Sequence, residues 1–174
     1  MSNFRVPLGF GVAALVFYFS KPTGSFMILG FPLALLGLTF RAAAAGVIQK
    51  DAVLAQTGPY RLTRNPLYLG SSLLAAGFAV MSGSLTSAIT LLVPFGIIYP
   101  AVIRKEERHL EGLFGNEFGH FRNRVPRFFP QRLDPLIFRD FSFEQYLSNR
   151  EYNALVGFVG STGVLAVKML LQSG

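Results

Sequence analysis

The sequence contains no cysteine, no tryptophan and only two histidines in 174 residues. Without a thiol the chain has no disulfide, no thiolate nucleophile and no Cys-ligated metal, and two imidazoles are few for a histidine-built metal site. Charge is scarce as well, because charged residues make up 14% of the chain, against about 25% in soluble domains. With apolar residues at 51%, these deficits predict a membrane protein without a metal site.

The charge that is present is mostly basic. Sixteen Lys and Arg against nine Asp and Glu give a formal net charge of +7. Such an excess can bind nucleic acid, but in so apolar a chain it favours anionic lipid head groups, and we expect membrane lipid as the partner. We also expect no cleaved signal peptide, because the first apolar run lacks a small-residue cleavage site and several runs follow it.

Five apolar runs predict the fold. They cover residues 6–19, 25–40, 66–81, 85–103 and 152–171. A helix that crosses a bilayer needs about 20 apolar residues, and proline inside such a helix is tolerated. The pattern therefore predicts an all-α integral membrane helical bundle with about five transmembrane helices.

We expect one membrane domain over residues 1–174 with three parts. Residues 1–56 hold the first two spans, and residues 42–56 are expected to continue as a helix along the membrane surface. Residues 57–131 form the core, a helical hairpin followed by a basic, aromatic lid, with a helix end at Gly115. Residues 132–174 form a short surface helix, for which Ser142 and Gln145 supply a capping box, and a last span.

Two polar blocks flank the central hairpin. The first runs from Thr57 to Gly70 and the second from Arg104 to His109. Within the first block, Asn65-Pro66 is typical of a helix N-cap and first helical residue. The spans 66–81 and 85–103 are joined by a short turn, so equal rises of about 1.5 Å per residue return the chain to its starting depth. The two blocks should therefore meet in one pocket at the end of the hairpin.

Each feature of this pocket has a simpler interpretation when it is taken alone. Asn65 and Pro66 can be only a helix start, and Arg64 can serve only to orient the chain in the membrane. Tyr60 and Tyr68 are also typical of the membrane interface, and charges four residues apart are typical of a solvated helix face. The combination, in this order and spacing, favours an active site.

The basic residues predict the orientation of that site. With five spans and an inner N-terminus, the inner side holds Arg5, four basic residues from position 41 to 64 and nine from position 104 to 150. Lys21 and Lys168 are left on or near the outer side, which is a strong positive-inside bias. We expect the site on the cytoplasmic side, in the inner membrane if the chain is bacterial.

Five short blocks carry a family resemblance. They are Gly58–Arg61, Arg64–Gly70, Glu106-Glu107, Leu113–Phe118 and Arg124–Pro130. In this order and with apolar spacers, they resemble the isoprenylcysteine carboxyl methyltransferase family, which groups with membrane phospholipid methyltransferases. The resemblance covers about residues 40–131. It implies an integral membrane enzyme that uses S-adenosyl-L-methionine and differs in fold from the soluble Rossmann methyltransferases.

The resemblance also implies roles for residues of both blocks. Its cofactor site comprises Tyr60, Asn65, Pro66, Leu67, Tyr68, Gly70, Glu106 and Glu107. One of the two glutamates is expected to accept hydrogen bonds from the donor, and the N–H groups that start the third span would face the donor's carboxylate. Arg64 and Glu107 are the implied catalytic residues. Arg64 would hold an anionic acceptor, with Arg124 and Arg127 as second choices.

Three positions depart from the family pattern. Asn65 stands where many members have histidine, and Phe118 and Phe121 stand where tyrosines are usual. The apolar run 152–171 lies beyond the matched blocks, so an extra span, an oligomer contact and a wall of the lipid entrance all remain open for it.

The acceptor is expected to be lipophilic, either an isoprenylcysteine-like carboxylate or another lipid. Two alternatives remain at this point: a membrane scaffold that has lost catalysis, and an isoprenoid or sterol reductase that binds a nicotinamide cofactor. The sequence does not decide the acceptor or the oligomeric state.

Overall fold

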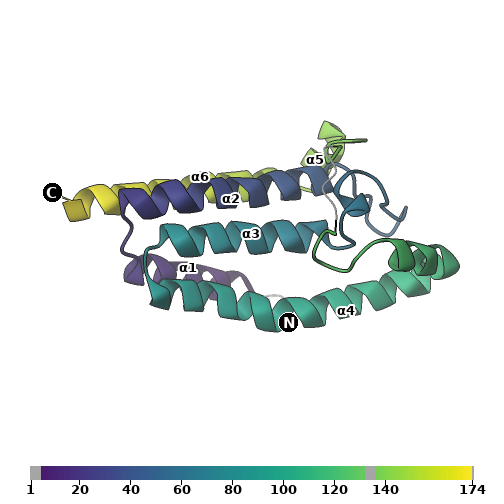
Figure 1. The fold of residues 1–174 in the computed structure, drawn as a ribbon, viewed down its shortest axis with the longest axis horizontal. Helices are drawn as coiled ribbons and strands as arrows, with labels where there is room; N and C mark the ends of the chain where they lie inside the picture. Colours follow the sequence, from purple (N-terminus) through teal and green to yellow (C-terminus); the bar gives the residue numbers. More distant parts are fainter. Residues whose placement is uncertain (1–4, 132–135, 174) are drawn as a thin grey trace.

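The computed structural model describes residues 5–131 and 136–173, and within these ranges the regular elements are all helical (Figure 1). They are α1 (Arg5–Phe19), α2 (Gly24–Ala45), the 3-10 helix η1 (Gly58–Arg61), α3 (Pro66–Met81), α4 (Leu85–Arg124), α5 (Phe143–Ser148) and α6 (Tyr152–Ser173). The predicted start of the third part, at residue 132, lies outside the described residues.

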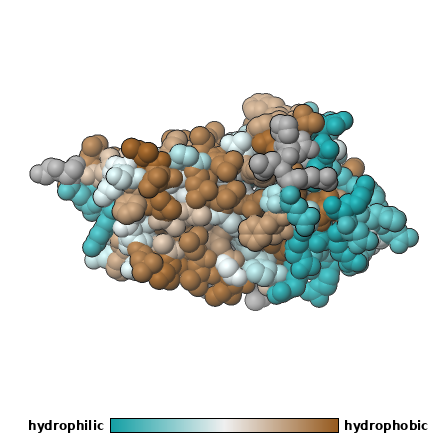
Figure 2. All heavy atoms as spheres, viewed as in Figure 1, coloured by the Kyte–Doolittle hydropathy of each residue, from teal (hydrophilic) through white to brown (hydrophobic). Residues whose placement is uncertain are grey.

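The predicted membrane helical bundle is confirmed. Three helices of the described part, α2, α4 and α6, are long and apolar enough to cross a membrane. α1 and α3 are shorter, with 15 and 16 residues, where a full span needs about 20. Apolar side chains cover the body of the molecule, and hydrophilic ones gather at one end (Figure 2).

The central hairpin has the predicted bounds. α3 begins at Pro66 with Asn65 in the N-cap position and ends at Met81. Gly83 makes the turn to α4 with φ +59°, and a Cβ there would lie 2.2 Å from the carbonyl oxygen of Lys21. Glycine is therefore required at this turn both for its backbone conformation and for space.

The predicted surface helix over residues 42–56 is wrong. α2 ends at Ala45, and the chain then runs through turns and irregular backbone to η1. The Asn149 side chain donates to the carbonyls of Ala45 and Ile48, at 2.8 and 3.0 Å, and the Phe141 ring packs so closely on Gly46 that a Cβ there would lie 2.1 Å away. Groups about a hundred residues later in the chain thus end this helix.

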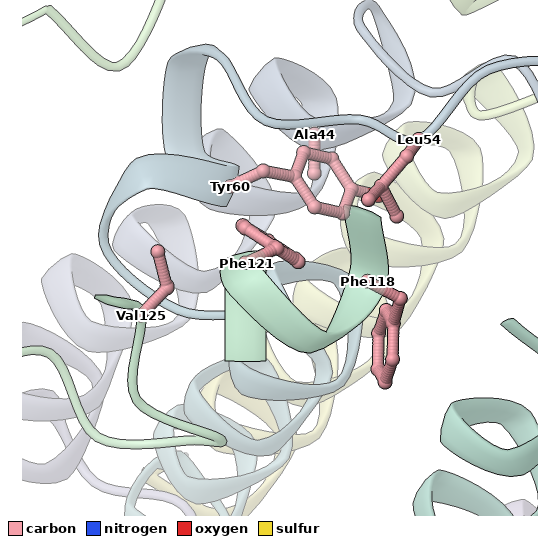
Figure 3. Close-up of a cluster of buried hydrophobic side chains, with 6 residues drawn as sticks. All are labelled: Ala44, Leu54, Tyr60, Phe118, Phe121 and Val125. Atoms are coloured by element: carbon pink, nitrogen blue, oxygen red, sulfur yellow. The ribbon is translucent and has the colours of Figure 1, made fainter. Parts of the chain in front are cut away.

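The predicted helix end at Gly115 is a kink. Gly115 has φ 49° and ψ −120°, and helical structure resumes until Arg124. The helical continuation contributes Phe118, Phe121 and the following Val125 to a buried cluster with Ala44, Leu54 and Tyr60 (Figure 3). This packing explains why the segment stays helical instead of forming an irregular lid.

Glycines bring α2 and α3 into backbone contact. A Cβ at Gly37 would lie 2.3 Å from the Leu74 nitrogen, and one at Gly77 would lie 2.4 Å from the Ala34 nitrogen. Small residues of this kind allow membrane helices to approach closely. The contact fixes the end of α2 and the start of α3 at the same, hydrophilic end of the bundle (Figures 1 and 2).

Candidate active site

A cavity of about 280 Å³, here called the first cavity, lies where the two polar blocks meet. The loop after α2, η1, the start of α3 and the end of α4 surround it. Its lining includes Tyr60, Arg64, Asn65, Pro66, Leu67, Tyr68, Glu106 and Glu107. The structure therefore brings together residues that stand about forty positions apart in the sequence.

Glu107 is the most heavily engaged carboxylate of this cavity. It is 7% exposed, and its Oε1 lies 3.3 Å from Arg64 Nη1 and 3.3 Å from Asn65 Nδ2. Its Oε2 lies 2.8 Å from Arg127 Nη2. A buried carboxylate needs such partners, because taking a charge out of water is costly unless it is paired and hydrogen-bonded.

Arg64 lines the same cavity and has an unused donor. Its side chain is 8% exposed, and within the described residues its Nε is buried without a hydrogen-bond partner. Burial lowers the pKa of Arg64, and the neighbouring Glu107 opposes this shift. The guanidinium nevertheless stays protonated at neutral pH. A buried donor without a partner costs about 1–3 kcal/mol.

Asn65 occupies the predicted N-cap position without acting as a cap. Its side chain makes no capping hydrogen bond to α3 and donates instead to Glu107 Oε1 and to the carbonyl of Arg127, at 3.3 and 2.9 Å. The first turn of α3, where Leu67 and Tyr68 line the cavity, therefore has no side-chain cap. Helix N-termini of this kind attract anionic groups.

The two tyrosines of the first polar block differ in their surroundings. Tyr68 donates to Glu106 Oε2 at 2.6 Å, and its ring meets Tyr99 edge-on at a centroid distance of 5.0 Å. Tyr60 is buried, and burial is the main cause that raises its pKa, with Glu106 adding to the effect. Tyr60 is thus a neutral phenol. The carboxylate of Glu106 lies in the lining of the cavity.

Three of the predicted site residues lie apart from the cavity lining. Gly70 packs in the contact between α2 and α3, where a Cβ would lie 2.8 Å from the Cγ of Arg41. Arg124 is exposed and donates to the Gln56 side chain at 3.0 Å. Arg127 is half-exposed and binds Glu107. Of the three arginines expected to hold the acceptor, Arg64 alone lines the first cavity.

Sequence reasoning missed the segment after α2. Seven residues of it line the first cavity: Ile48, Gln49, Lys50, Asp51, Val53, Leu54 and Ala55. Asp51 Oδ1 also lies 3.0 Å from His109 Nε2, which joins this segment to α4. The one sequence signal for the missed segment was Gly46, since glycine is common just after a helix end.

Comparison with known proteins identifies related chains. The family model for phospholipid methyltransferases matches residues 10–117, more than half of the chain. Cobalt-zinc-cadmium resistance protein CzcN of Cupriavidus metallidurans is 36% identical over 135 residues, which cover 73% of this chain and 62% of that protein. Nickel-cobalt-cadmium resistance protein NccN of Alcaligenes xylosoxydans xylosoxydans is 40% identical over 83 residues, which cover 48% of this chain and 38% of that protein.

The name of a third relative states the reaction of that protein. Protein-S-isoprenylcysteine O-methyltransferase of Schizosaccharomyces pombe is 28% identical over 94 residues, which cover 54% of this chain and 40% of that protein. The chain thus spans less than two thirds of the length of each of these relatives. No solved structure shows a significant match to it. The family match and the motif resemblance agree, and the chain belongs to the phospholipid methyltransferase family of membrane proteins.

Proposed function

We propose that this protein is a membrane methyltransferase that uses S-adenosylmethionine and acts on a lipophilic acceptor. The observation that carries the proposal is the first cavity, in which Arg64 and Glu107 from the two polar blocks form a buried ion pair with 3.3 Å between Nη1 and Oε1. A membrane scaffold has no need of an ion pair of this kind beside a cavity, because burying two charges costs free energy.

The chemistry of the lining fits the proposed methyl donor. The carboxylates of Asp51, Glu106 and Glu107 outnumber the cations of Lys50 and Arg64, which suits a sulfonium and an ammonium group. The guanidinium of Arg64, which lines the cavity, and the uncapped start of α3 suit the donor's carboxylate. The volume of about 280 Å³ is close to the lower end of the range of small-molecule sites, about 300 Å³.

Different residues of the site are assigned to different parts of the proposed donor. S-adenosylmethionine, when bound, supplies a methyl group on a sulfonium centre for in-line displacement. Glu106 and Tyr68, joined at 2.6 Å, border the cavity and present a carboxylate and an aromatic face, and both stabilise a cation. Leu54, Phe118 and Phe121 form an apolar wall that excludes water.

Arg64 receives a different role from the one expected from the motif. It lines the same cavity as the other residues assigned to the donor, so we assign it to the donor's carboxylate rather than to the acceptor. Glu107 positions this guanidinium through the ion pair. The positive-inside bias of the basic residues supports placing the site on the cytoplasmic side.

Calorimetric titration of the detergent-purified protein with S-adenosylmethionine and S-adenosylhomocysteine tests the proposal. We expect saturable binding that Glu106→Gln weakens. Glu111→Gln is the matched control, because Glu111 lies on the same helix, is exposed and pairs with Arg122 at 2.9 Å. Absence of binding by a protein with intact helical circular dichroism would refute the proposal. Binding of a nicotinamide cofactor instead would indicate a reductase.

A further inference from the structure

The structure separates the two kinds of charge in the second polar block. Its glutamates, Glu106 and Glu107, line the first cavity, and Glu107 is only 7% exposed. Its basic residues Arg104, Lys105 and Arg108 are absent from that lining, and all three are exposed. One turn of α4 therefore carries its acidic groups toward the bundle and three basic groups away from it, and the function proposed above does not use the basic ones.

The three exposed cations have no acidic partner among the described residues. Carboxylates pair with four other arginines of the described chain, which are Arg41, Arg64, Arg122 and Arg127. Arg108 makes one hydrogen bond with a described residue, from its Nε to the Arg104 carbonyl at 3.3 Å. Like charges this close on a helix destabilise it, so an anion bound to them would be favourable.

The basic residues continue an exposed apolar stripe of α4, which runs along one edge of the bundle (Figure 1). Five exposed residues follow one another at intervals of three or four positions and share one helix face: Val93, Ile97, Ala101, Arg104 and Arg108. Val93 is 48% and Ile97 is 70% exposed. We call these five residues, with the adjacent Lys105, the outer face of α4. It is apolar along the membrane-spanning part and basic at its end.

The length of α4 places the basic end of this face at the depth of lipid head groups. The helix begins at Leu85 and is apolar enough to cross a membrane. At about 1.5 Å per residue it rises about 28 Å by Arg104, and the hydrocarbon core of a bilayer is about 30 Å thick. A phospholipid whose chain lies along Val93 and Ile97 would therefore have its phosphate beside Arg104 and Arg108.

Membrane orientation alone does not explain this arrangement. The positive-inside rule depends on how many basic residues lie near the ends of the spans, whichever face of a helix they occupy. Here the basic residues share a face with exposed apolar side chains and lie opposite the buried Glu107. Guanidinium and ammonium groups bind phosphate, and the apolar stripe suits an acyl chain.

We propose that the outer face of α4 binds an anionic phospholipid, with Arg104, Lys105 and Arg108 on its phosphate and with Val93 and Ile97 against an acyl chain. The continuity of the basic residues with lipid-facing apolar surface identifies a membrane lipid, rather than a soluble phosphate, as the ligand. This lipid is not the methyl acceptor, because it lies on the side of α4 that faces away from the first cavity. The inference goes beyond the proposed function and does not depend on it.

The absence of native tryptophan allows a fluorescence test. Ile97→Trp places one tryptophan on the outer face, between the apolar and the basic residues. The variant is reconstituted in phosphatidylcholine vesicles that contain the same mole fraction of dibrominated phosphatidylglycerol or dibrominated phosphatidylcholine as the quencher. We expect phosphatidylglycerol to bind at least about fivefold more strongly, which is the factor that one basic residue near the membrane surface supplies. Equal quenching by the two lipids would refute the proposal.

Charge-matched variants in the Ile97→Trp background test the location of the site. Two triple variants remove the same charge from exposed positions: Arg104→Gln, Lys105→Gln and Arg108→Gln on the outer face, and Lys21→Gln, Arg122→Gln and Arg139→Gln elsewhere. We expect the first variant to lose the preference for phosphatidylglycerol and the second to keep it, with helical circular dichroism intact in both.

Two outcomes would refute the assigned site. Loss of the preference in both triple variants would show that total charge attracts the lipid, and an unchanged preference in both would place the lipid elsewhere. Arg104→Lys with Arg108→Lys keeps the charge without the forks, so we expect it to retain most of the preference. This conservative variant also provides the test if the neutralised outer face does not fold, because a complete loss there would contradict a site that binds through charge.

Discussion

The Tyr68 hydroxyl lies 2.6 Å from Glu106 Oε2, and this hydrogen bond joins α3 to α4 at the border of the first cavity. Both residues line this cavity. A change here should affect the binding of the proposed methyl donor.

Tyr68→Phe removes the hydroxyl and keeps the ring. We expect S-adenosylhomocysteine to bind at least about tenfold more weakly, because Glu106 loses the partner that orients it, and a hydrogen bond to a charged group contributes about 1.5–3 kcal/mol. Calorimetry provides the measurement. Tyr18→Phe, at a position 77% exposed on α1, is the control, and equal affinities of the two variants would contradict the prediction.

Glu107→Gln should lower the stability of the fold. The amide leaves Arg64 buried without its counter-charge, and breaking a buried pair by removing one partner costs about 3–5 kcal/mol. The change is measured as a shift in the thermal unfolding midpoint in detergent. The exposed pair of Glu111 and Arg122 supplies the control, since Glu111→Gln should cost about 1 kcal/mol or less. Similar shifts in the two variants would contradict the buried ion pair.

Arg64→Ala should weaken donor binding and turnover together, because the structure places Arg64 in the first cavity. Arg64→Lys keeps the charge but loses the fork, so we expect it to recover part of the affinity. Donor binding is measured by calorimetry and turnover by transfer of a radiolabelled methyl group to extracted lipid. If Arg64→Ala binds the donor normally and still fails to turn over, Arg64 serves the acceptor.

Gly37→Ala should destabilise the protein, because its Cβ would lie 2.3 Å from the Leu74 nitrogen in the adjacent helix. Overpacking of this kind costs about 1–3 kcal/mol. Gly157→Ala is the control: a Cβ there has no neighbour within 4 Å, and alanine favours a helix over glycine by about 1 kcal/mol. The thermal unfolding midpoint should therefore fall for Gly37→Ala and rise for Gly157→Ala. A shift in the same direction for both variants would argue against the close contact.

Tyr60 predicts a loss of stability at high pH. Burial raises its pKa in the folded state, so the unfolded chain releases this proton first and stability falls above the unfolded pKa of about 10. Tyr60→Phe removes this contribution. We expect its unfolding midpoint to fall less than that of the wild type between about pH 9 and about pH 11. Parallel plots of the unfolding midpoint against pH for the two proteins would show that Tyr60 ionises freely in the folded protein.

The hairpin was predictable because its signals are local. Asn65 and Pro66 mark the start of α3, and Ser82 to Ser84 mark the turn, so nearby residues determine both ends. The segment after Ala45 was harder to predict, because Gly46 is its one local signal, and the Asn149 side chain and the Phe141 ring contact the end of that helix from a distant part of the chain. No local pattern reports such contacts.

The residues that form the site were easier to predict than the contacts that they make. The motif selected Arg64, Asn65 and Glu107, and the structure brings them together. The same motif offered no means to distinguish Gly70, whose place is set by packing against Arg41, from residues that line the cavity. A motif shows which positions matter but not whether a position serves packing or binding.

The glycine contacts between α2 and α3 have a consequence for motion. Backbone in direct contact with backbone cannot slide or tilt without collision, so these two helices form a stiff frame that carries Arg41 and the first turn of α3. Glu151, the residue just before α6, pairs with Arg41 of this frame through side chains, whereas α1 packs against α4. Fluctuations that admit a long ligand from the bilayer should therefore concentrate in α1 and α6, and hydrogen exchange should be slowest along α2 and α3.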